Sequence, residues 1–229
     1  MPTASLIIMA YNRIEQLKRT LPSIRFHRVD EAILVDDGSE DGTSDWIAQE
    51  YPDIKVIRSE KSAEDKWLNP AKARNIGVTA AIGDIVIVQD AECHHISDAL
   101  AQAIAHLQCR RPLLVTPEAP IYEQYGIRPH GPNPAYRYLF MATWKEDWIA
   151  IGGCNEFYTQ WGNEDVELET RWLTAGYDII ADPKIELRHL AHHSTEGDQQ
   201  RWRFECEFHQ WYSDRLKEGL GDPRLIWQH

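Results

Sequence analysis

The stretch that decides the fold is Ile85-Val86-Ile87-Val88-Gln89-Asp90-Ala91-Glu92, in which an apolar, mostly β-branched run ends in two acids. Such a run is typical of a strand buried at the centre of a parallel sheet. Asp and Glu are poor strand formers, and open α/β sheets bind ligands at the carboxyl ends of their strands. Because residues i and i+2 of a strand lie on the same side, Asp90 and Glu92 can face one cation together. An ordinary polar loop after a strand is the alternative.

Upstream of this stretch, short apolar segments alternate with helical ones. Strands are expected at residues 5–10, 32–35 and 54–57, and helices at 12–26, 43–51 and 71–82. Strict alternation of this kind predicts an α/β protein with a mostly parallel, Rossmann-like central sheet flanked by helices. Asn12 is expected to cap the first helix. No G-x-G-x-x-G motif follows the first strand, which argues against a dinucleotide cofactor.

Polar residues follow three of these strands at the point where each strand ends. They are Tyr11-Asn12-Arg13, Asp36-Asp37 and Asp90-Ala91-Glu92. The carboxyl ends of parallel strands meet at one edge of a sheet, so the three groups are expected to converge. Solvated loops alone explain such convergence poorly, and a binding site at that edge is favoured.

The second half of the chain also contains elements of both kinds. Helices are expected at 99–108, at 145–151, from Asn163 or Glu164 to a stop at Gly176, and at 198–217, and strands at 113–115, 136–143 and 179–180. Residues 117–135 contain five prolines and two glycines and form a loop too long for a simple connection. Loops of that length in compact domains are often lids or binding loops.

Bulk composition limits the class of protein. The formal net charge of −12 at pH 7 disfavours binding to nucleic acid through general electrostatics. No apolar run approaches the roughly 18 residues of a membrane-spanning helix, and the N-terminus lacks the pattern of a signal peptide. The four cysteines show no C-x-x-C spacing, so neither a zinc knuckle nor a disulfide framework is expected. A reducing, cytoplasmic location is the natural expectation.

Four stretches, taken in order, resemble the motifs of a known enzyme family. They are Val35-Asp36-Asp37-Gly38-Ser39-Glu40-Asp41-Gly42-Thr43, Ala73-Arg74-Asn75-Ile76-Gly77, Gly83-Asp84 through Asp90-Ala91-Glu92, and Gly152-Gly153-Cys154-Asn155-Glu156 through Trp161-Gly162-Asn163-Glu164-Asp165-Val166-Glu167. On these stretches the chain resembles, over nearly its full length, the GT-A fold glycosyltransferases of the family 2 type. The last stretch is similar to the W-G-x-E-D segment of galactosyl- and N-acetylgalactosaminyltransferases and of bacterial chondroitin-type polymerases, which serve polysaccharide biosynthesis.

The resemblance implies a metal site built on Asp90-Ala91-Glu92, the counterpart of the family's D-x-D motif. Mn²⁺ or Mg²⁺ is the expected ion, and it would neutralise the diphosphate leaving group as a Lewis acid. Glu92 stands where the family has Asp, so direct and water-mediated binding of the metal both stay open for it. Among the histidines that follow, His192 is favoured as a further ligand, then His189, and imidazole suits Mn²⁺ better than Mg²⁺.

The resemblance also implies a nucleotide site at the strand ends. The residues expected to bind the donor nucleotide are Ala10, Tyr11, Arg13, Asp36, Asp37, Arg74 and Asp90. Tyr11 would line or stack on the uracil, and either Asp36 or Asp37 would accept the uracil ring N–H. Arg74 would approach the uridine or the diphosphate as a forked donor, with an ion pair to Asp90 or Asp36 as the alternative.

By its match to the W-G-x-E-D segment, Asp165 is the expected catalytic base, and Glu164 is expected to bind hydroxyls of the sugar. An inverting transfer needs a base that takes the proton of the acceptor hydroxyl as this oxygen attacks. Trp161 and Gly162 are expected to form a platform for the donor or acceptor ring. The alternative for the two acids is a structural role at a helix N-terminus, where carboxylates complement the helix dipole.

Two further expectations concern packing. Asn75 and Gly77 are expected to serve the packing of their helix. Cys154 stands where the family usually has an aromatic residue, so the packing around Gly153 is expected to differ from the family pattern.

The sequence therefore predicts a metal-dependent inverting glycosyltransferase that moves a hexose or N-acetylhexosamine from a UDP-sugar to a glycan, glycolipid or other hydroxyl acceptor. One domain is expected, with a nucleotide-sugar half at 1–98, an acceptor and catalytic half at 99–195, and an amphipathic helix and tail at 196–229. This helix is expected to dock onto the sheet, with an acceptor groove, a homodimer face and contact with the inner membrane surface as alternatives. A non-catalytic carbohydrate-binding or scaffold module and a sugar nucleotidyltransferase are the competing functions.

Overall fold

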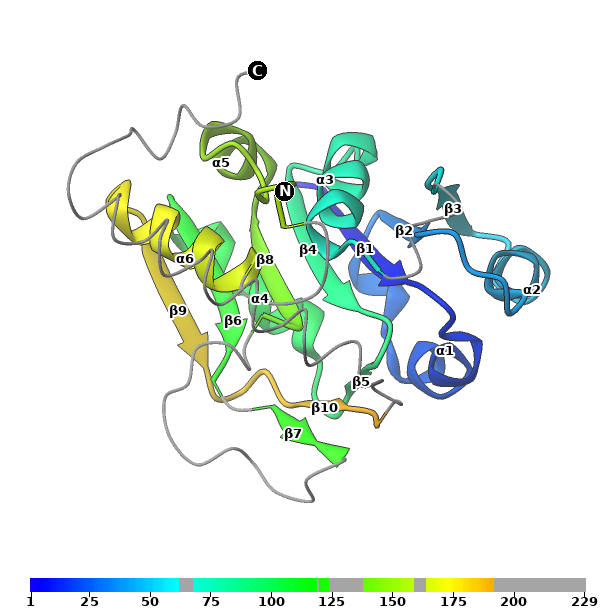
Figure 1. Cartoon of the computed structure of the whole chain (residues 1–229). Coiled ribbons are helices and arrows are strands. Elements are labelled where there is room, and N and C mark those ends of the chain that lie inside the picture. The colour runs from blue at the N-terminus through cyan, green and yellow to red at the C-terminus, as the bar shows by residue number, and fades with distance from the viewer. Residues whose placement is uncertain (62–67, 119, 124–137, 159–163, 192–229) are drawn as a thin grey trace.

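Seven strands form the central sheet of the computed structural model, which describes residues 1–61, 68–118, 120–123, 138–158 and 164–191. The strands are β1 (Ala4–Ala10), β2 (Glu31–Asp36), β3 (Ile54–Arg58), β4 (Ile85–Asp90), β6 (Leu113–Pro117), β8 (Phe140–Trp144) and β9 (Asp178–Asp182). Their order across the sheet is β3-β2-β1-β4-β8-β6-β9 (Figure 1). The apolar run that ends in two acids is β4, and it lies at the centre of the sheet.

The central sheet is mostly parallel. β1 pairs in parallel with β2 and β4, β2 pairs in parallel with β3, and β6 pairs in parallel with β9. β8 lies between β4 and β6 and runs antiparallel to both. Strands from both halves of the chain therefore share one hydrogen-bonded sheet. The predicted α/β class with a mostly parallel central sheet is confirmed.

Helices cover both faces of this sheet (Figure 1). Those described are α1 (Ile14–Thr20), α2 (Thr43–Glu50), α3 (Pro70–Ala80), α4 (Ala99–Cys109), α5 (Lys145–Ala150) and α6 (Glu164–Thr174). Side chains of β1 alternate between two apolar cores. Leu6 packs into the core that α1, α2 and α4 close, and Ile7 packs into the core that α3, α5 and α6 close. The predicted positions of α2 to α6 are confirmed to within about two residues at each end.

A glycine lets α3 approach the sheet closely. A Cβ atom added at Gly77 would lie 2.3 Å from Cγ2 of Ile7 and 3.1 Å from Cγ2 of Val35. No side chain fits at that distance, so glycine at this position is a packing requirement, as expected from the sequence. The close approach brings the neighbouring residue Arg74 over the carboxyl ends of the central strands.

A second, smaller sheet crosses the edge at which the parallel strands end. It consists of β5 (Cys93–His95), β10 (Leu187–His189) and β7 (Ile121–Tyr122), in the order β5-β10-β7. Figure 1 shows the arrowheads of β4 and β9 pointing towards it. The sequence analysis did not predict this sheet, because its strands are two or three residues long and their partners are far apart in the sequence.

The first helix differs from the prediction in its start and its length. Asn12 does not cap it: its φ is 53°, in the left-handed region, and its Oδ1 accepts from the Glu40 N–H at 2.7 Å. The Ile14 N–H instead donates to Asp41 at 3.0 Å, so the cap comes from a neighbouring loop. The helix ends at Thr20 rather than near residue 26, and a 3-10 turn containing Pro22 follows, because proline has no N–H to continue the α-helical ladder.

Two other predicted elements have different outcomes. The strand expected at 136–143 begins only at Phe140, after a turn at Tyr138 and Leu139. The helix expected at 198–217 lies outside the described residues.

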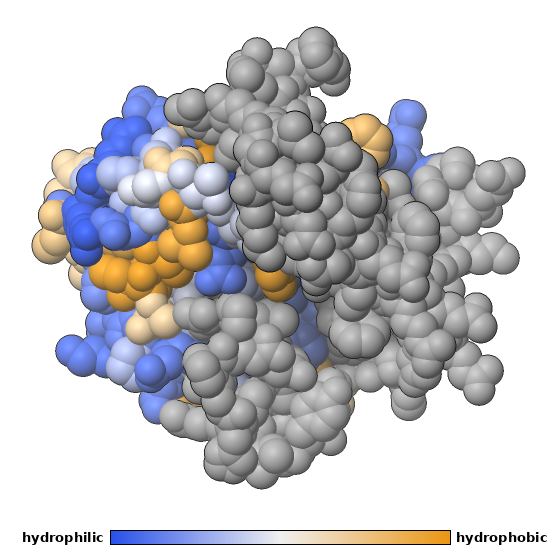
Figure 2. Space-filling model, turned by 60° about the vertical axis from the view of Figure 1, so that its left-hand side comes forward, coloured by the Kyte–Doolittle hydropathy of each residue, from blue (hydrophilic) through white to orange (hydrophobic). Residues whose placement is uncertain are grey.

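Figure 2 brings the side with β9 and α6 forward. On this face the described residues include an apolar patch bordered by hydrophilic residues. Large apolar side chains with high exposure are Ile82, Ile149, Phe157 and Leu173. Within the part of the chain that the structure describes, no helix combines the length and apolar character needed to cross a bilayer.

Candidate active site

Asp90 stands at the carboxyl end of β4, where its side chain reaches the sheet edge. Its N–H donates to the Leu139 carbonyl at 2.9 Å, which holds the end of the strand in place. The side chain keeps 22% of its surface exposed, so it is open to a ligand. Burial raises its pKa to about 8, against the lowering effect of Arg74, and the charges of nearby acids raise it further. Most of the population therefore carries a proton on this carboxyl at neutral pH when no cation is bound.

Arg74 joins this strand end to the second half of the chain. It is 3% exposed, and its Nη1 donates to Glu164 Oε1 at 2.9 Å, while Nη2 lies 3.9 Å from Asp90 Oδ1. Glu164 is itself 2% exposed and begins α6. An ion pair involving Arg74 was the alternative considered from the sequence, but with Asp90 or Asp36 as the partner. The structure makes Glu164 the nearer partner, a choice that needs the packing of α3 against α6.

Asp165 follows Glu164 at the start of α6 and is half-buried. Burial raises the pKa of its carboxyl to about 7, the charge of Glu164 adds to the rise, and Arg74 opposes it. Its Oδ1 also accepts from the Val166 N–H at 2.7 Å. The pKa of Asp90 responds to Asp165 as well, so the two predicted site acids lie within electrostatic reach of each other. A carboxylate with a pKa near 7 is suited to general-base catalysis at neutral pH.

Glu92, the second acid of the predicted metal motif, is paired with Arg13. The Arg13 Nε donates to Glu92 Oε1, and the Arg13 Nη1 donates to the carbonyls of Tyr11 and Asn12 at 3.2 Å each. The guanidinium therefore ties the segment after β1 to the turn after β4. In this arrangement Glu92 already faces a counterion, and direct and water-mediated binding of a metal both stay open for it.

His189 is brought next to the same turn by the small sheet. It pairs across the ladder with Cys93, and the following Leu190 N–H donates to the Glu92 carbonyl at 3.0 Å. Residues directly opposite each other in such a pair project to the same side. Burial raises the pKa of the Cys93 thiol, and the charges of Asp90 and Glu92 raise it further. The side of the small sheet on which Cys93 and His189 lie is therefore near these two acids.

The donor set fits a divalent cation. Carboxylates outnumber the guanidinium groups around this edge; the acids are Asp90, Glu92, Glu164 and Asp165, and the arginines are Arg13 and Arg74. A bound cation would relieve the repulsion that raises the pKa of Asp90. Within the described residues, no three His, Cys, Asp or Glu side chains are already gathered as a complete ligand set. His192, the favoured histidine ligand, lies outside the described residues, as do Trp161 and Gly162.

Asp36 is buried and fully engaged in the loop that follows β2. It accepts from the Ser39 N–H at 2.7 Å, from the hydroxyl of Ser44, and from Arg58 at 3.2 Å. Its carboxylate thus shapes the loop that follows β2. Ala10, at the end of β1, is buried, and its carbonyl accepts from the Asp37 N–H at 2.8 Å.

Asp37 lies near Tyr11, and Lys61 contacts both residues. It accepts from the Asn69 N–H at 2.7 Å and from the hydroxyl of Ser59, and Lys61 Nζ lies 3.0 Å from its Oδ2. The same ammonium lies 3.8 Å from the centroid of the Tyr11 ring. The charge of Asp37 also raises the pKa of Tyr11, after burial and Glu40. Of the two acids, Asp37 is therefore the one beside the aromatic ring.

The sequence analysis missed Lys61. It follows the end of β3, where Ser59, Glu60 and Lys61 form a fourth polar strand end at the same edge of the sheet. The rule that picked out the other three groups would also have picked out this one, had it been applied to β3.

Asn75 clamps the segment that follows α5. Its Oδ1 accepts from the Cys154 N–H at 2.8 Å, and its Nδ2 donates to the Cys154 carbonyl at 2.8 Å and to Glu156 at 2.9 Å. A Cβ atom at Gly153 would lie 2.6 Å from the same Oδ1. Asn75 therefore serves packing, as expected, and the small buried Cys154 fits beside α3.

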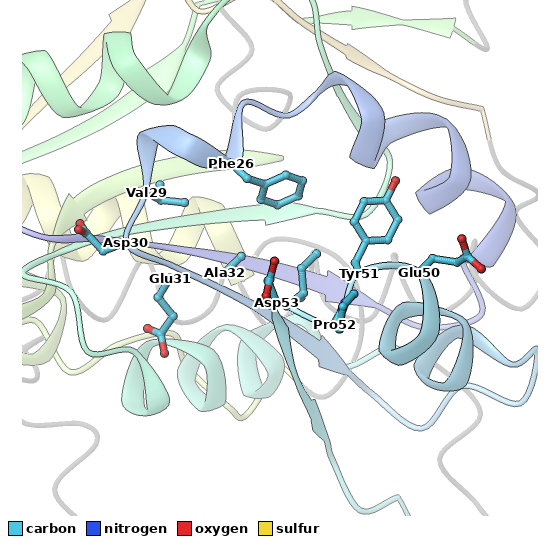
Figure 3. A pocket seen from close by; sticks show the side chains of 10 residues that line it. Phe26, Val29, Asp30, Glu31, Ala32, Glu50, Tyr51, Pro52 and Asp53 are labelled. Atoms are coloured by element: carbon cyan, nitrogen blue, oxygen red, sulfur yellow. The ribbon is translucent and has the colours of Figure 1, made fainter.

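A cavity of about 370 Å³ lies at the opposite edge of the sheet, where β2 and β3 begin (Figure 3). Its lining includes Phe26, Glu31, Tyr51 and Asp53. Glu31 accepts from the Ser5 hydroxyl at 2.7 Å and from the Ile82 N–H at 3.0 Å, so it braces the ends of the strands. The carboxylates that line this cavity would repel a nucleotide, and it is separate from the acids described above.

The stability of the protein without metal should fall between about pH 6 and about pH 8.5. The folded pKa values of Asp90 and Asp165, about 8 and about 7, are raised above their ordinary value of 3.8. The folded state therefore holds more protons than the unfolded state in this range, and stability decreases with pH. Thermal melts across the range measure the effect. Asp165→Asn should weaken the dependence, and a melting temperature that stays constant or rises would contradict the assignment.

Two protein-family models match the chain. Residues 5–159 match glycosyl transferase family 2, and residues 124–195 match the N-terminal domain of galactosyltransferase. The chain is 39% identical over 67 residues to the mouse protein N-acetyl-beta-glucosaminyl-glycoprotein 4-beta-N-acetylgalactosaminyltransferase 1. It is 35% identical over 104 residues to the uncharacterized glycosyltransferase YfnE of Bacillus subtilis. These matches cover 28% and 44% of this chain but only 6% and 26% of the two relatives.

Two solved structures are similar in fold. One is the mannosyltransferase PcManGT from Pyrobaculum calidifontis in complex with GDP-Man and Mn²⁺, with a TM-score of 0.65 and 19% identity. The other is GalNAc-T7 with UDP, GalNAc and Mn²⁺, with a TM-score of 0.67 and 20% identity. The alignments cover 87% and 86% of this chain, and 60% and 44% of the two structures. At these identities the likeness shows the fold, and it confirms the predicted GT-A architecture.

Proposed function

Because the chain belongs to glycosyl transferase family 2, we propose that it is a metal-dependent inverting glycosyltransferase. Its donor would be a UDP-hexose or UDP-N-acetylhexosamine, and its acceptor a hydroxyl of a glycan or glycolipid. One observation carries the proposal: acids from both halves of the chain, Asp90 and Asp165, gather around the buried Arg74 at the carboxyl edge of the sheet.

The donor nucleotide is proposed to bind beside Tyr11 and Asp37. Tyr11 offers a ring on which a uracil can stack, and Asp37 offers a carboxylate oxygen for the ring N–H. Lys61, now over Tyr11, would move aside or turn its ammonium to the diphosphate. Asp36 is proposed to support this site by holding its loop, and Ala10 to form its floor. Two similar proteins support a UDP donor. The mouse relative is named as an N-acetylgalactosaminyltransferase, and the structure of GalNAc-T7 contains UDP.

The metal is proposed to bind at Asp90, with Glu92 and a histidine, His189 or His192, completing the protein ligands. When bound, a Mn²⁺ or Mg²⁺ ion supplies Lewis-acid stabilisation of the leaving diphosphate. Arg74, held by Glu164, adds a fixed positive charge beside Asp90, and Arg13 adds another beside Glu92. These guanidinium groups draw the anionic donor to an edge that is otherwise acidic.

Asp165 is proposed to act as the base of the transfer. Its carboxylate takes the proton from the acceptor hydroxyl, whose oxygen forms a bond to the anomeric carbon. The bond from that carbon to the diphosphate oxygen breaks on the opposite face, which inverts the configuration. Glu164 is proposed to contact a hydroxyl of the donor sugar with the same carboxylate that holds Arg74. Trp161 and Gly162 remain proposed as the ring platform.

The cellular compartment is proposed from the cysteines of the chain. A reducing cytoplasmic compartment, with contact to the inner membrane surface if the acceptor is a glycolipid, suits a chain whose three described cysteines are free thiols. A homodimer is kept as a proposal for the C-terminal segment.

A donor screen tests the proposed function. We expect UDP release in Mn²⁺ from at least one of UDP-glucose, UDP-galactose, UDP-N-acetylglucosamine and UDP-N-acetylgalactosamine when candidate glycan acceptors are present. A carbohydrate-binding module would release no UDP. Release of pyrophosphate from a nucleoside triphosphate and a sugar phosphate would show a nucleotidyltransferase instead.

Binding of UDP should depend on the metal. Calorimetry is expected to show an affinity on the order of tenfold higher with Mn²⁺ than with a chelator, because a cation held at Asp90 would offset the repulsion between this acidic edge and the anionic UDP. Asp90→Asn should remove most of this difference, and Asp84→Asn, an acid at the other end of β4, should leave it unchanged. Equal UDP affinity with and without Mn²⁺ would reject the metal site.

A further inference from the structure

The turn at residues 90–92 is anchored through its main chain on several sides. The Asp90 N–H donates to Leu139 at 2.9 Å, and the Ala91 N–H donates to Met9 at 3.0 Å. The Glu92 carbonyl accepts from the Leu190 N–H at 3.0 Å. All these partners are main-chain groups of neighbouring strands and turns, so they follow from the fold of the sheets.

The Ala91 carbonyl is held differently, by a side chain from outside both sheets. Thr20, the last residue of α1, donates its hydroxyl to this carbonyl at 2.9 Å. Thr20 is 1% exposed, and Ala91 is equally buried. A buried hydrogen bond of this kind is costly to lose, because the carbonyl would be left without its donor away from water. It acts on the central residue of the acidic motif.

A chain of contacts extends this anchor to both sides of the motif. The Ser23 hydroxyl donates to the Thr20 carbonyl at 2.6 Å and accepts from the His95 N–H at 2.9 Å. The His95 Nε2 lies 2.8 Å from Gln89 Oε1. Burial lowers the pKa of His95 to about 4, so the ring is neutral at pH 7 and donates from Nε2 to the amide oxygen. Gln89 and His95 flank the acidic turn.

Residues at both ends of helix α1 therefore contact the acidic turn at residues 90–92. Arg13, just before the helix, pairs with Glu92, and Thr20, at its end, holds Ala91. A rigid helix of seven residues fixes the distance between these two contacts. The direction in which Asp90 and Glu92 project depends on the orientation of the peptides between them, and the Thr20 hydroxyl binds the carbonyl of one of these peptides.

We propose that Thr20 is a positioning residue of the metal site: its hydroxyl fixes the Ala91 peptide so that the carboxylates on either side present one arrangement to a divalent cation. This role rests on the proposed metal-dependent function. Groups that orient ligands without touching the metal typically change metal affinity 10- to 100-fold when they are removed. Thr20→Val keeps the shape of the side chain and removes the hydroxyl, so we expect about a tenfold weaker Mn²⁺ affinity.

The chain offers a matched control for the loss of a buried threonine hydroxyl. Thr143 of β8 is 1% exposed and donates to the Leu113 carbonyl at 2.8 Å. It pairs with Val86, four residues before Asp90 on β4. Thr143→Val should lower the melting temperature by an amount similar to Thr20→Val and leave Mn²⁺ affinity unchanged. Thr20→Ser keeps the hydroxyl and should restore Mn²⁺ affinity.

The experiment measures Mn²⁺ binding to the full chain by calorimetry, in the presence of UDP, for the wild type and these variants. Thr20→Ala serves as a second hydroxyl-free variant if Thr20→Val does not fold. Weaker Mn²⁺ binding in the Val or Ala variant, with wild-type behaviour in Thr20→Ser and Thr143→Val, supports the positioning role. Wild-type Mn²⁺ affinity in a folded Thr20→Val or Thr20→Ala protein overturns the positioning role of Thr20 and leaves the proposed metal site standing. A wild-type protein that binds no Mn²⁺ overturns the proposed metal site and this role with it.

Discussion

An Asp165→Asn protein is expected to transfer sugar on the order of 10² to 10⁴ times more slowly than the wild type, while its UDP affinity in Mn²⁺ stays nearly unchanged. Asparagine has the shape of aspartate and keeps an oxygen that can accept from the Val166 N–H, so the start of α6 should fold normally. It cannot take a proton from an acceptor hydroxyl. Single-turnover transfer with a saturating donor measures the change in the chemical step.

The pH dependence of transfer gives a second view of the same group. With the pKa of Asp165 at about 7, wild-type transfer should rise with pH through this value, because only the carboxylate form accepts a proton. The residual activity of Asp165→Asn should lack this rise. Bound metal would shift the midpoint to lower pH, since a nearby cation favours the carboxylate.

Glu169→Gln is the matched control for Asp165→Asn. Glu169 lies one helical turn along α6, and its neutralisation changes the charge of the same helix by the same amount. We expect transfer close to the wild-type rate. Full transfer activity in an Asp165→Asn protein that binds UDP normally would remove Asp165 from the mechanism.

Arg74→Met is expected to destabilise the protein by roughly 3–5 kcal/mol, because it removes the buried guanidinium that pairs with the buried Glu164 carboxylate. Both side chains of this pair are almost fully excluded from water, at 3% and 2% exposure. The neighbouring acids should respond as well: Arg74 lowers the pKa of Asp90 and of Asp165, so both values should rise when it is removed. Chemical denaturation measures the loss of stability, and the metal requirement of UDP binding should increase.

A double variant separates the pair from the packing of α3. Adding Glu164→Gln to Arg74→Met removes the buried negative charge as well, so part of the lost stability should return, and the coupling should exceed about 1 kcal/mol in a double-mutant cycle. The exposed pair Lys18–Glu15, 2.7 Å apart, provides the control: Lys18→Met should change stability by less than about 1 kcal/mol. Additive effects of the Arg74 and Glu164 changes would show that the two groups do not interact in solution.

Much of the fold was readable from local pattern. β1, β2 and β4 are apolar runs of four or more residues, and their burial on both faces follows from their central place in a parallel sheet. α3 was placed by Pro70 at its first position, and Asn69 caps it by accepting from the Lys72 N–H at 2.9 Å. These signals lie within a few residues of the element they specify, so a single sequence contains them. The small sheet has no such signal, because its three strands derive their stability from partners distant in the chain.

The candidate site divides in the same way. The sequence identified the acids Asp90, Glu92 and Asp165, because acids after buried strands and in a recognisable motif stand out locally. It named Asp90 or Asp36 as the ion-pair alternative for Arg74 and left open the choice between Asp36 and Asp37 at the uracil. The structure pairs Arg74 with Glu164, 90 residues away, and places Asp37 rather than Asp36 beside Tyr11. Both outcomes depend on loops and helices that meet only when the sheet has formed.

The stretch at 85–92 shows which features are local and which depend on tertiary structure. Its residues alone determined a buried central strand that ends in two carboxylates, since hydrophobic periodicity and strand propensity are properties of the local chain. Its surroundings were decided by tertiary structure: Arg13 against Glu92, Arg74 beside Asp90, and the Thr20 hydroxyl on the carbonyl between them. Those contacts join segments separated by 16 to 79 residues, and the free energy of such contacts depends on packing that no local pattern encodes.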